Sequence, residues 1–352
     1  VMPAMGAANG LALVDMRGLE YGHPLWETLL DQLTFQEMTG LLTANFSNAA
    51  VGSVMKPALT DSDGPAGITA SLGVGAKGYG YGVEVLLAST WNKDLARRQG
   101  ELVGEDSLFT MVSGWYAPAC NIHRSAFSGR NFEYYSEDSL LSGVFAGTVV
   151  AGAGGKGVYC YLKHFALNDQ ETNRVKINTF SNEQAARQIY LRPFEIAVRD
   201  YGCNTMMLSM NCIGMTWVGH HRNLLDNIVR GEWGFEGMIN TDTQGNFGAD
   251  INDTAVWAGT DMFLSAQTLD ETEVRGSPTM MNELREAAHH ILYVTANSNG
   301  MNGISNSTRI VNITPPWVMW LVAANVAVIG GALAGLALNI RRTVRNMKKK
   351  EA

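Results

Sequence analysis

The sequence predicts an α/β fold: a (β/α)8 TIM-type barrel, complete or lacking one strand, followed by a single transmembrane helix. Two observations carry this prediction. Between residues 51 and 296, short apolar runs alternate with stretches of helical periodicity, which is typical of a parallel sheet covered by helices. Near the C-terminus, 24 consecutive residues (317–340) contain no charged side chain.

The candidate strands are apolar runs that end in polar or small residues. They cover residues 54–60, 85–89, 111–118, 157–164, 204–211, 237–242 and 261–265. Stretches 182–199 and 221–232 between them have the periodicity of amphipathic helices. No eighth strand is evident, and residues 11–14 are a weak candidate for it. A doubly wound open sheet is the alternative, although no glycine-rich dinucleotide motif follows the first run.

Composition divides the chain into five parts. We expect residues 1–50 to be a lead-in whose helices pack on the barrel, and residues 51–296 to form the barrel. Residues 297–316, rich in Asn, Ser and Gly, are expected to form a polar stalk. Residues 317–340 reach about 36 Å as a helix, enough to cross a hydrocarbon core of ~30 Å. Residues 341–352 form a basic tail.

Charge predicts the orientation in the membrane. The net charge of -7 comes from 26 Lys and Arg against 33 Asp and Glu. The tail holds six basic residues and one Glu (+5), which leaves 20 basic and 32 acidic residues (-12) for the body. The positive-inside rule then places the C-terminus in the cytoplasm and the barrel outside it. Residues 1–13 lack the pattern of a signal peptide, so we expect an export signal upstream.

Several classes of function find no support in the sequence. The acidic body argues against a nucleic-acid partner. The four cysteines show no CxxC or zinc spacing, and the histidine pairs at 220–221 and 289–290 are adjacent residues that point to different sides of an element. No GxSxG motif is present. We therefore expect neither a metal site nor a cofactor.

Polar side chains follow the predicted strands. They are Asp61 and Asp63, Asn121 with His123 and Arg124, Lys163 and His164, Ser209 and Asn211, and Asp242. The C-terminal ends of barrel strands meet at one face, so these groups are expected to converge there. Carboxylates, amides and cations with Trp91, Trp115 and Trp217 nearby suit a polyhydroxylated ligand, because sugars present hydroxyls at their edges and C–H groups on their faces.

Four motifs, in this order, resemble the barrel domain of glycoside hydrolase family 3. They are DSDGPAGI (61–68), SGRNFEYYSEDSLLSG (128–143), LKHFALNDQETNR (162–174) and GEWGFEGMINTD (231–242). The resemblance runs from about residue 15 to residue 297. It is strongest to members with reversed domain order, in which sandwich and fibronectin-like domains come first and a membrane anchor comes last.

The resemblance implies a retaining, exo-acting β-glycosidase, similar to the β-glucosidases, that hydrolyses a β-linked oligosaccharide or glycoside by double displacement. Asp242 matches the nucleophile of the family pattern G-F-x-G-x-x-x-[ST]-D. The expected substrate-binding residues are Asp63, Arg130, Lys163 and His164, with Ser209 and Asn211 as candidates for the pocket floor. Glu133 and Asp138, and Glu171 and Arg174, are expected to form supporting ion pairs.

The sequence departs from the family at Thr243 and Met210, where many members have an aromatic residue, and at Asn121, where Asp is common. The acid/base carboxyl is expected from an upstream sandwich domain, although Asp169 and Glu171 are substitutes by composition. These departures support an alternative function, a non-catalytic carbohydrate-binding surface protein on a decayed barrel. A scaffold for membrane assembly is a third hypothesis, resting on the GxxxG motif at 331–335.

Overall fold

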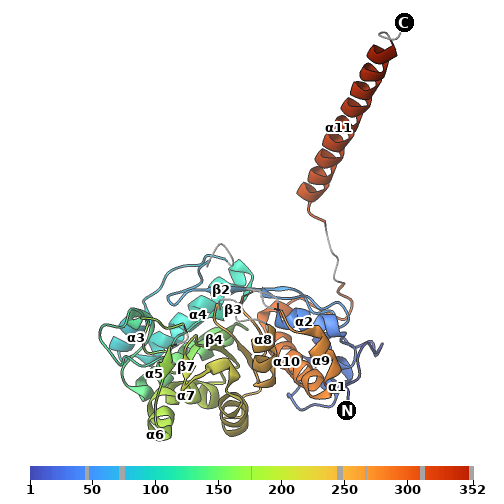
Figure 1. Ribbon diagram of the computed structural model, residues 1–352. Helices are drawn as coiled ribbons and strands as arrows, with labels where there is room; N and C mark the ends of the chain where they lie inside the picture. The colour runs from blue at the N-terminus through green and yellow to red at the C-terminus, as the bar shows by residue number, and fades with distance from the viewer. Residues whose placement is uncertain are drawn as a thin grey trace. The chain divides into compact units, whose positions relative to one another are not determined.

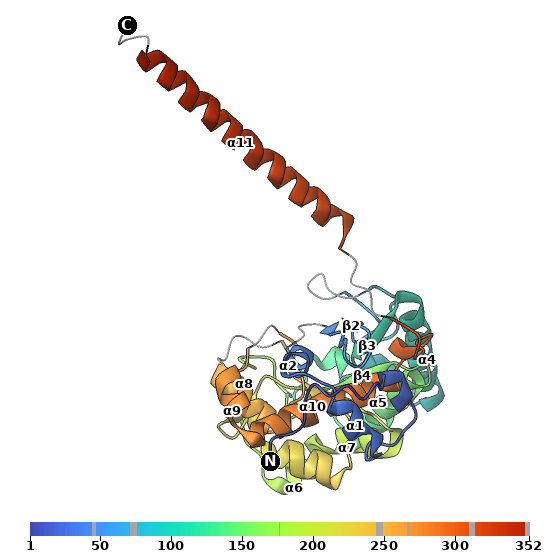
Figure 2. The ribbon, with the colours of Figure 1, turned by 90° about the vertical axis from the view of Figure 1, so that its right-hand side faces the viewer.

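The computed structural model describes residues 1–43, 47–70, 76–175, 177–243, 249–265, 268–309 and 314–348. The chain divides into two compact units, Val1–Thr308 and Arg309–Ala352. The first unit is an α/β body in which helices surround a central sheet (Figure 1). Figure 2 gives a second view of this body.

The central sheet has six strands in the order β1-β2-β3-β4-β6-β9. They are β1 (Ser47–Asn48), β2 (Leu59–Asp63), β3 (Val112–Tyr116), β4 (Tyr159–Phe165), β6 (Thr205–Leu208) and β9 (Met238–Asn240). β1 is antiparallel to β2, and every other neighbouring pair is parallel. All residues of β3, β4, β6 and β9 are buried, which explains their nearly continuous apolar sequences.

The structure also describes a second, three-stranded sheet. It joins β5 (Asn178–Thr179), β7 (Cys212–Ile213) and β8 (Thr216–Trp217), with β5 parallel to β7 and β7 antiparallel to β8. It ties the loop after β4 to the loop after β6, since the Cys212 backbone N–H donates to the Ile177 carbonyl at 2.8 Å.

The helices of the body are short except where they cover the parallel strands. They are η1 (Leu13–Met16), α1 (Leu25–Leu30), α2 (Phe35–Leu42), α3 (Glu84–Ser89), α4 (Lys93–Thr110), η2 (Asn131–Glu133), α5 (Ser139–Gly154), α6 (Glu183–Ala185), η3 (Ala186–Tyr190), α7 (Arg192–Tyr201), η4 (Val218–His220), η5 (Asn223–Glu232), α8 (Ala249–Trp257), α9 (Glu271–Gly276), α10 (Pro278–Ala296) and η6 (Asn299–Met301). Asn92 caps α4 by accepting from Asp94 N and Leu95 N, and Asp138 caps α5 through Leu141 N. α4 and α5 approach so closely that a Cβ on Gly100 would collide with the Val149 carbonyl.

Three predicted strands differ from the structure. Residues 54–60 overlap β2 only at Leu59 and Thr60. Residues 85–89 form α3 rather than a strand, with Glu84, Leu87 and Ala88 buried and Leu86 exposed. This spacing is helical, but an apolar run of five residues is compatible with either structure. Residues 261–265 pair with β9 as an isolated bridge between Asn240 and Met262 and form no strand of the sheet. In the part of the chain that the structure describes, a closed eight-stranded barrel is therefore not confirmed.

The body also extends further than the expected barrel boundary at residue 296. Asn299 N donates to the Gly157 carbonyl at 2.8 Å, its side chain donates to the Val112 carbonyl at 2.9 Å, and Met301 is fully buried. These contacts attach the first part of the predicted stalk, up to Thr308, to the body.

The second unit contains one long helix, α11 (Pro316–Lys348). It includes the uncharged segment 317–340, and its length and composition are sufficient to cross a membrane. Arg341, Arg342 and Arg345 continue the helix beyond that segment, while residues 349–352 of the predicted tail lie outside the described residues.

Candidate active site

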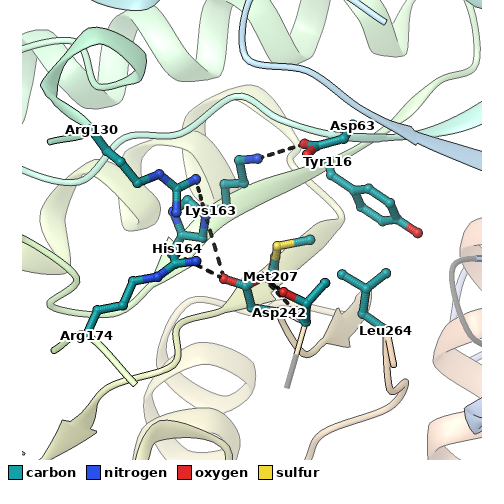
Figure 3. A pocket seen from close by; sticks show the side chains of 10 residues that line it. Asp63, Tyr116, Arg130, Lys163, His164, Arg174, Met207, Asp242 and Leu264 are labelled. Carbon is teal, nitrogen blue, oxygen red and sulfur yellow. Dashed lines mark hydrogen bonds and ion pairs between the residues drawn. The ribbon is translucent and has the colours of Figure 1, made fainter. Parts of the chain in front are cut away.

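A cavity of about 340 Å³ lies at the C-terminal ends of the parallel strands. Its lining residues are Asp63, Tyr116, Arg130, Lys163, His164, Arg174, Met207, Asp242, Thr243 and Leu264 (Figure 3). The strands position most of them: Asp63 ends β2, Tyr116 ends β3, Lys163 and His164 belong to β4, and Asp242 follows β9. Parallel strands therefore bring together residues that are far apart in the sequence, as predicted for this face.

Lys163 is the central cation of the cavity. Its Nζ donates to Asp63 Oδ1 at 3.0 Å and lies 3.9 Å from Glu133 Oε2, and its side chain is 4% exposed. Burial raises the pKa of Asp63, but the Lys163 ammonium, the Gly64 N–H and Arg130 together outweigh this effect, and the pKa is lowered. Asp63 is therefore a carboxylate at neutral pH.

His164 is a neutral hydrogen-bonding group. Burial, Arg130 and Lys163 hold its pKa well below the usual value. Arg130 Nη2 lies 2.9 Å from His164 Nε2, and because a guanidinium can only donate, Nε2 must accept. The proton of the imidazole is then on Nδ1, which faces the Tyr134 hydroxyl at 3.4 Å. Arg130 also donates from Nε to Glu133 Oε1, which confirms the predicted supporting role of that carboxylate.

The carboxyl group of Asp242 has one oxygen fixed and the other directed across the cavity. Oδ1 accepts from Thr243 N at 2.6 Å and from Thr243 Oγ1 at 3.3 Å. Oδ2 lies 3.8 Å from Arg174 Nη1 and 3.9 Å from His164 Nε2 (Figure 3). Burial raises the pKa of Asp242, while Arg174, the Thr243 N–H, Arg130 and Lys163 oppose this rise by favouring the ionised form.

Asn121 does not line the cavity but fixes the backbone of His164. Its Nδ2 donates to the His164 carbonyl at 2.9 Å, and its Oδ1 accepts from His164 N at 2.7 Å. The peptide bond between Lys163 and His164 is cis. An amide can donate and accept at once, whereas a carboxylate can only accept. Asn at position 121, where Asp is common in the family, can therefore bind both the N–H and the carbonyl of His164, which Asp could not.

The interior below the cavity is also polar. Asp61, at 1% exposure, accepts from Tyr159 OH at 2.6 Å and Tyr161 OH at 2.9 Å. Burial raises its pKa, and these hydroxyls and the nearby ammonium of Lys56 oppose the rise. Lys56 is itself fully buried and donates to backbone carbonyls, among them that of Pro57 at 3.1 Å. The cavity thus lies above a second layer of satisfied polar groups.

Two predicted pocket residues do not line the cavity. Ser209 Oγ and Asn211 Nδ2 each donate to the Ala166 carbonyl at 3.1 Å, so they hold the turn that follows Lys163 and His164. The expectation of a pocket floor at Ser209 and Asn211 is therefore wrong in its geometry. β6 ends at Leu208, and beyond a strand end the alternation of side chains no longer predicts their direction.

Four cavity residues were not predicted to line it: Arg174, Tyr116, Met207 and Leu264. Arg174 forms the predicted pair with Glu171, at 3.4 Å, but it also reaches Asp242. Its only signal in the sequence was its place at the end of the motif 162–174. Tyr116 lies near the end of the predicted strand 111–118, and this position was its available signal in the sequence. In the structure it is the last residue of β3.

The carboxyls near the cavity differ in their access to it. Of the described residues that line it, only Asp63 and Asp242 carry carboxyl groups. Asp169 lies outside it, buried and accepting from Ile122 N at 3.0 Å, and burial raises its pKa to about 7. Glu171 is paired with Arg174 and does not line the cavity either.

Comparison with known proteins identifies the family. Residues 51–294 match the glycosyl hydrolase family 3 N terminal domain. The chain belongs to glycoside hydrolase family 3. All ten residues that line the cavity fall inside the matched segment of this family 3 domain.

Similar proteins include several β-glucosidases. Beta-glucosidase A of Butyrivibrio fibrisolvens is 36% identical over 244 residues, which is 67% of this chain and 29% of that protein. The beta-glucosidase of Rhizobium radiobacter is 33% identical over 275 residues, or 76% of this chain and 33% of that protein. The family 3 chain thus spans about a third of the length of these relatives.

Solved structures show the same fold. The family 3 chain matches beta-glucosidase 3B from Thermotoga neapolitana in complex with glucose with a TM-score of 0.70 at 32% identity, covering 79% of this chain and 43% of that one. A beta-glucosidase from Paenibacillus barengoltzii gives a TM-score of 0.74 at 28% identity, covering 89% and 36%. The fold is therefore the barrel-like α/β fold of the family's N-terminal domain.

Proposed function

We propose that this chain is the nucleophile-bearing domain of a retaining, exo-acting β-glycosidase of the β-glucosidase type. The observation that carries the proposal is Asp242, a carboxylate at the end of β9 with one oxygen held by Thr243 and the other facing the cavity. A retaining glycosidase needs such an ionised group beneath the anomeric carbon of its substrate. The substrate class is a β-linked oligosaccharide or glycoside whose terminal sugar enters the cavity.

The reaction proceeds in two displacements. Asp242 Oδ2 attacks the anomeric carbon, the bond from this carbon to the leaving oxygen breaks, and that oxygen takes a proton from a general acid. Water then attacks the glycosyl ester, gives its proton to the same group acting as a base, and releases the Asp242 carboxylate. Arg174 and Lys163 stabilise the ionised carboxylate before attack and after release.

The other polar groups of the cavity bind the sugar hydroxyls. Asp63 accepts hydrogen bonds from sugar hydroxyls, and Lys163 and Arg130 donate hydrogen bonds to hydroxyl oxygens. His164 Nδ1 and Nε2 are engaged with Tyr134 and Arg130, so small rotations exchange these partners for a hydroxyl. A cavity of about 340 Å³ is small among ligand sites, which range over ~300–1,000 Å³, and this size supports exo-action on one terminal ring.

The general acid belongs, in this proposal, to another part of the protein. Asp63 is paired with Lys163 and its pKa is lowered, so it is a poor proton donor at neutral pH. An upstream sandwich domain, in the reversed domain order, supplies the acid/base carboxyl. The chain spans 29% of beta-glucosidase A, which supports a site shared with further domains. Without the acid, rates on poor leaving groups fall by about 10²–10⁴-fold.

The anchor completes the proposal. α11 spans a lipid bilayer once, with Arg341, Arg342 and Arg345 on the cytoplasmic side and the family 3 body on the other side. The support is the length of the uncharged segment and the basic residues that follow it.

A second function is favoured by one feature of the cavity. Thr243 lines it where many family members have an aromatic residue, so a stacking surface for the sugar is missing. This supports a non-catalytic carbohydrate-binding protein. Under that function, sugar binds to the cavity but replacing Asp242 changes no rate of hydrolysis.

Azide rescue of the Asp242→Gly variant tests the proposed function. The substrate is 2,4-dinitrophenyl β-glucoside, whose leaving group needs no general acid. We expect Asp242→Gly to lose the activity and azide to restore turnover with an α-glucosyl azide product. Asp63→Gly, which removes the other carboxyl of the cavity, is the matched control and should not be rescued. Hydrolysis by Asp242→Gly at the wild-type rate would exclude the nucleophile.

A further inference from the structure

Glu84 is a buried carboxyl that the proposed reaction does not use. It is the first residue of α3 and is 1% exposed. Neither Oε1 nor Oε2 forms a hydrogen bond with another described residue. A carboxylate in such a place lacks the partners that normally compensate for its loss of hydration. The position therefore demands either a neutral acid or a charge partner.

The charged groups around Glu84 are those that organise the cavity. α3 packs against η2, which carries Glu133. The carboxylate of Glu133 repels a charge on Glu84, while Lys163 and Arg130 attract it. Tyr135 also interacts electrostatically with Glu84, and it stays neutral because burial raises its pKa.

Burial is the largest of the effects on Glu84. It raises the pKa of this carboxyl well above the usual value, Glu133 adds to the rise, and the Glu84 backbone N–H, Lys163 and Arg130 only reduce it. Glu133 already contacts both cations, through Arg130 Nε and Lys163 Nζ, and does not itself line the cavity. A neutral Glu84 leaves that arrangement undisturbed.

We propose that Glu84 is a positioning residue of the sugar site: as a neutral acid behind the cluster of Arg130, Glu133 and Lys163, it leaves both cations directed at the cavity, and its ionisation withdraws them. An ionised Glu84 competes with Asp63 for the Lys163 ammonium and repels Glu133 from its place between the cations. The inference rests on the proposed function to the extent that these cations bind the sugar.

Infrared spectroscopy tests the protonation of Glu84 without any assay of activity. The carbonyl stretch of a protonated carboxylic acid is separate from that of a carboxylate. In the full chain at pH 7 we expect a protonated-acid band that is lost in Glu84→Gln and retained in Glu105→Gln, an exposed control on α4. Glutamine has the shape of the protonated acid, so the variant is expected to fold. If it does not, the answer comes from loss of a protonated-acid band with rising pH in a protein carrying Asp169→Asn, which removes a second buried acid whose pKa is raised to about 7. Absence of the band at pH 7 would overturn the inference.

The affinity for glucose tests the positioning role. As pH rises through the ionisation of Glu84, we expect the wild-type protein to lose affinity for glucose. The loss is about tenfold for each unit by which bound glucose raises the pKa of Glu84. Glu84→Gln should keep its affinity over that range, and Glu105→Gln should follow the wild type. An equal loss of glucose affinity with rising pH in the wild type and in Glu84→Gln would overturn this inference but not the proposed function. Absence of glucose binding by every variant at every pH would instead contradict the proposed function, and the infrared result would still decide the protonation of Glu84.

Discussion

Replacing Lys163 with methionine removes the ammonium group that connects the carboxylates of the candidate site. In the wild-type protein this group lies 3.0 Å from Asp63 Oδ1 and 3.9 Å from Glu133 Oε2. Methionine retains most of the apolar volume of the side chain, so the cost of a cavity is small. The variant therefore isolates the loss of the charge and its hydrogen bond.

The magnitude follows from the burial of the partners. Removing one member of a buried ion pair costs about 3–5 kcal/mol. Here the Lys163 side chain is 4% exposed but that of Asp63 is 34% exposed, so water screens part of the interaction. Glu133 retains Arg130 as a partner. We therefore expect Lys163→Met to lower the free energy of unfolding by about 2 kcal/mol, within the discounted range.

A double-mutant cycle with Asp63→Asn separates the pair from other effects. Urea unfolding at pH 7 of the wild type, both single variants and the double variant should give a coupling energy of about 1–2 kcal/mol. The lowered pKa of Asp63 means that its stabilisation is present above its unfolded-state pKa and is lost as pH falls through the folded-state pKa. The coupling should therefore vanish in acid. Additivity within about 0.5 kcal/mol at pH 7 would refute the reasoning.

Three further predictions concern the support of the site and the anchor. Lys56→Met should lower stability by about 2–3 kcal/mol at pH 7, because backbone carbonyls lose their buried donor. The folded-state pKa of Lys56 is lowered to about 7, so above pH 7 the unfolded state binds more protons than the folded state. Urea unfolding should therefore show the wild type gaining stability relative to the variant between about pH 7 and 10. Asn121→Ala should cost about 1–3 kcal/mol in urea unfolding and reduce hydrolysis of 2,4-dinitrophenyl β-glucoside, because the His164 backbone loses two hydrogen bonds, and wild-type values for both would contradict this role. The full chain should sediment with lipid vesicles while residues 1–308 remain in the supernatant, and equal sedimentation would contradict a role for α11 in anchoring.

The sequence predicts much of this fold where strands are long and fully buried. The runs 111–118, 204–211 and 237–242 each contain an observed parallel strand, and 157–164 contains all of β4 but its last residue. Burial on both faces demands such continuous apolar sequence. Residues 85–89 fail because so short an apolar run does not distinguish a strand from a buried turn of helix.

The candidate site is predictable where a side chain belongs to a strand end. Asp63, Lys163 and His164 lie in the cavity because the register of parallel strands brings their ends together. Ser209 and Asn211 follow the end of β6, where the chain turns and their amide and hydroxyl groups satisfy a backbone carbonyl instead. The protonation of buried groups such as Glu84 depends on neighbours from distant segments, so it cannot be predicted from the sequence.

The most direct test of the central claim is to trap the glycosyl intermediate on Asp242. 2,4-Dinitrophenyl 2-deoxy-2-fluoro-β-glucoside has a leaving group that departs without a general acid, and its fluorine slows hydrolysis of the ester, so the intermediate accumulates. Peptide mass spectrometry should find one fluoroglucosyl group, attached to the peptide that contains Asp242. A glycosyl group on Asp63 or another carboxyl, or release of dinitrophenol with no adduct at any time, would contradict the assignment of Asp242 as the nucleophile.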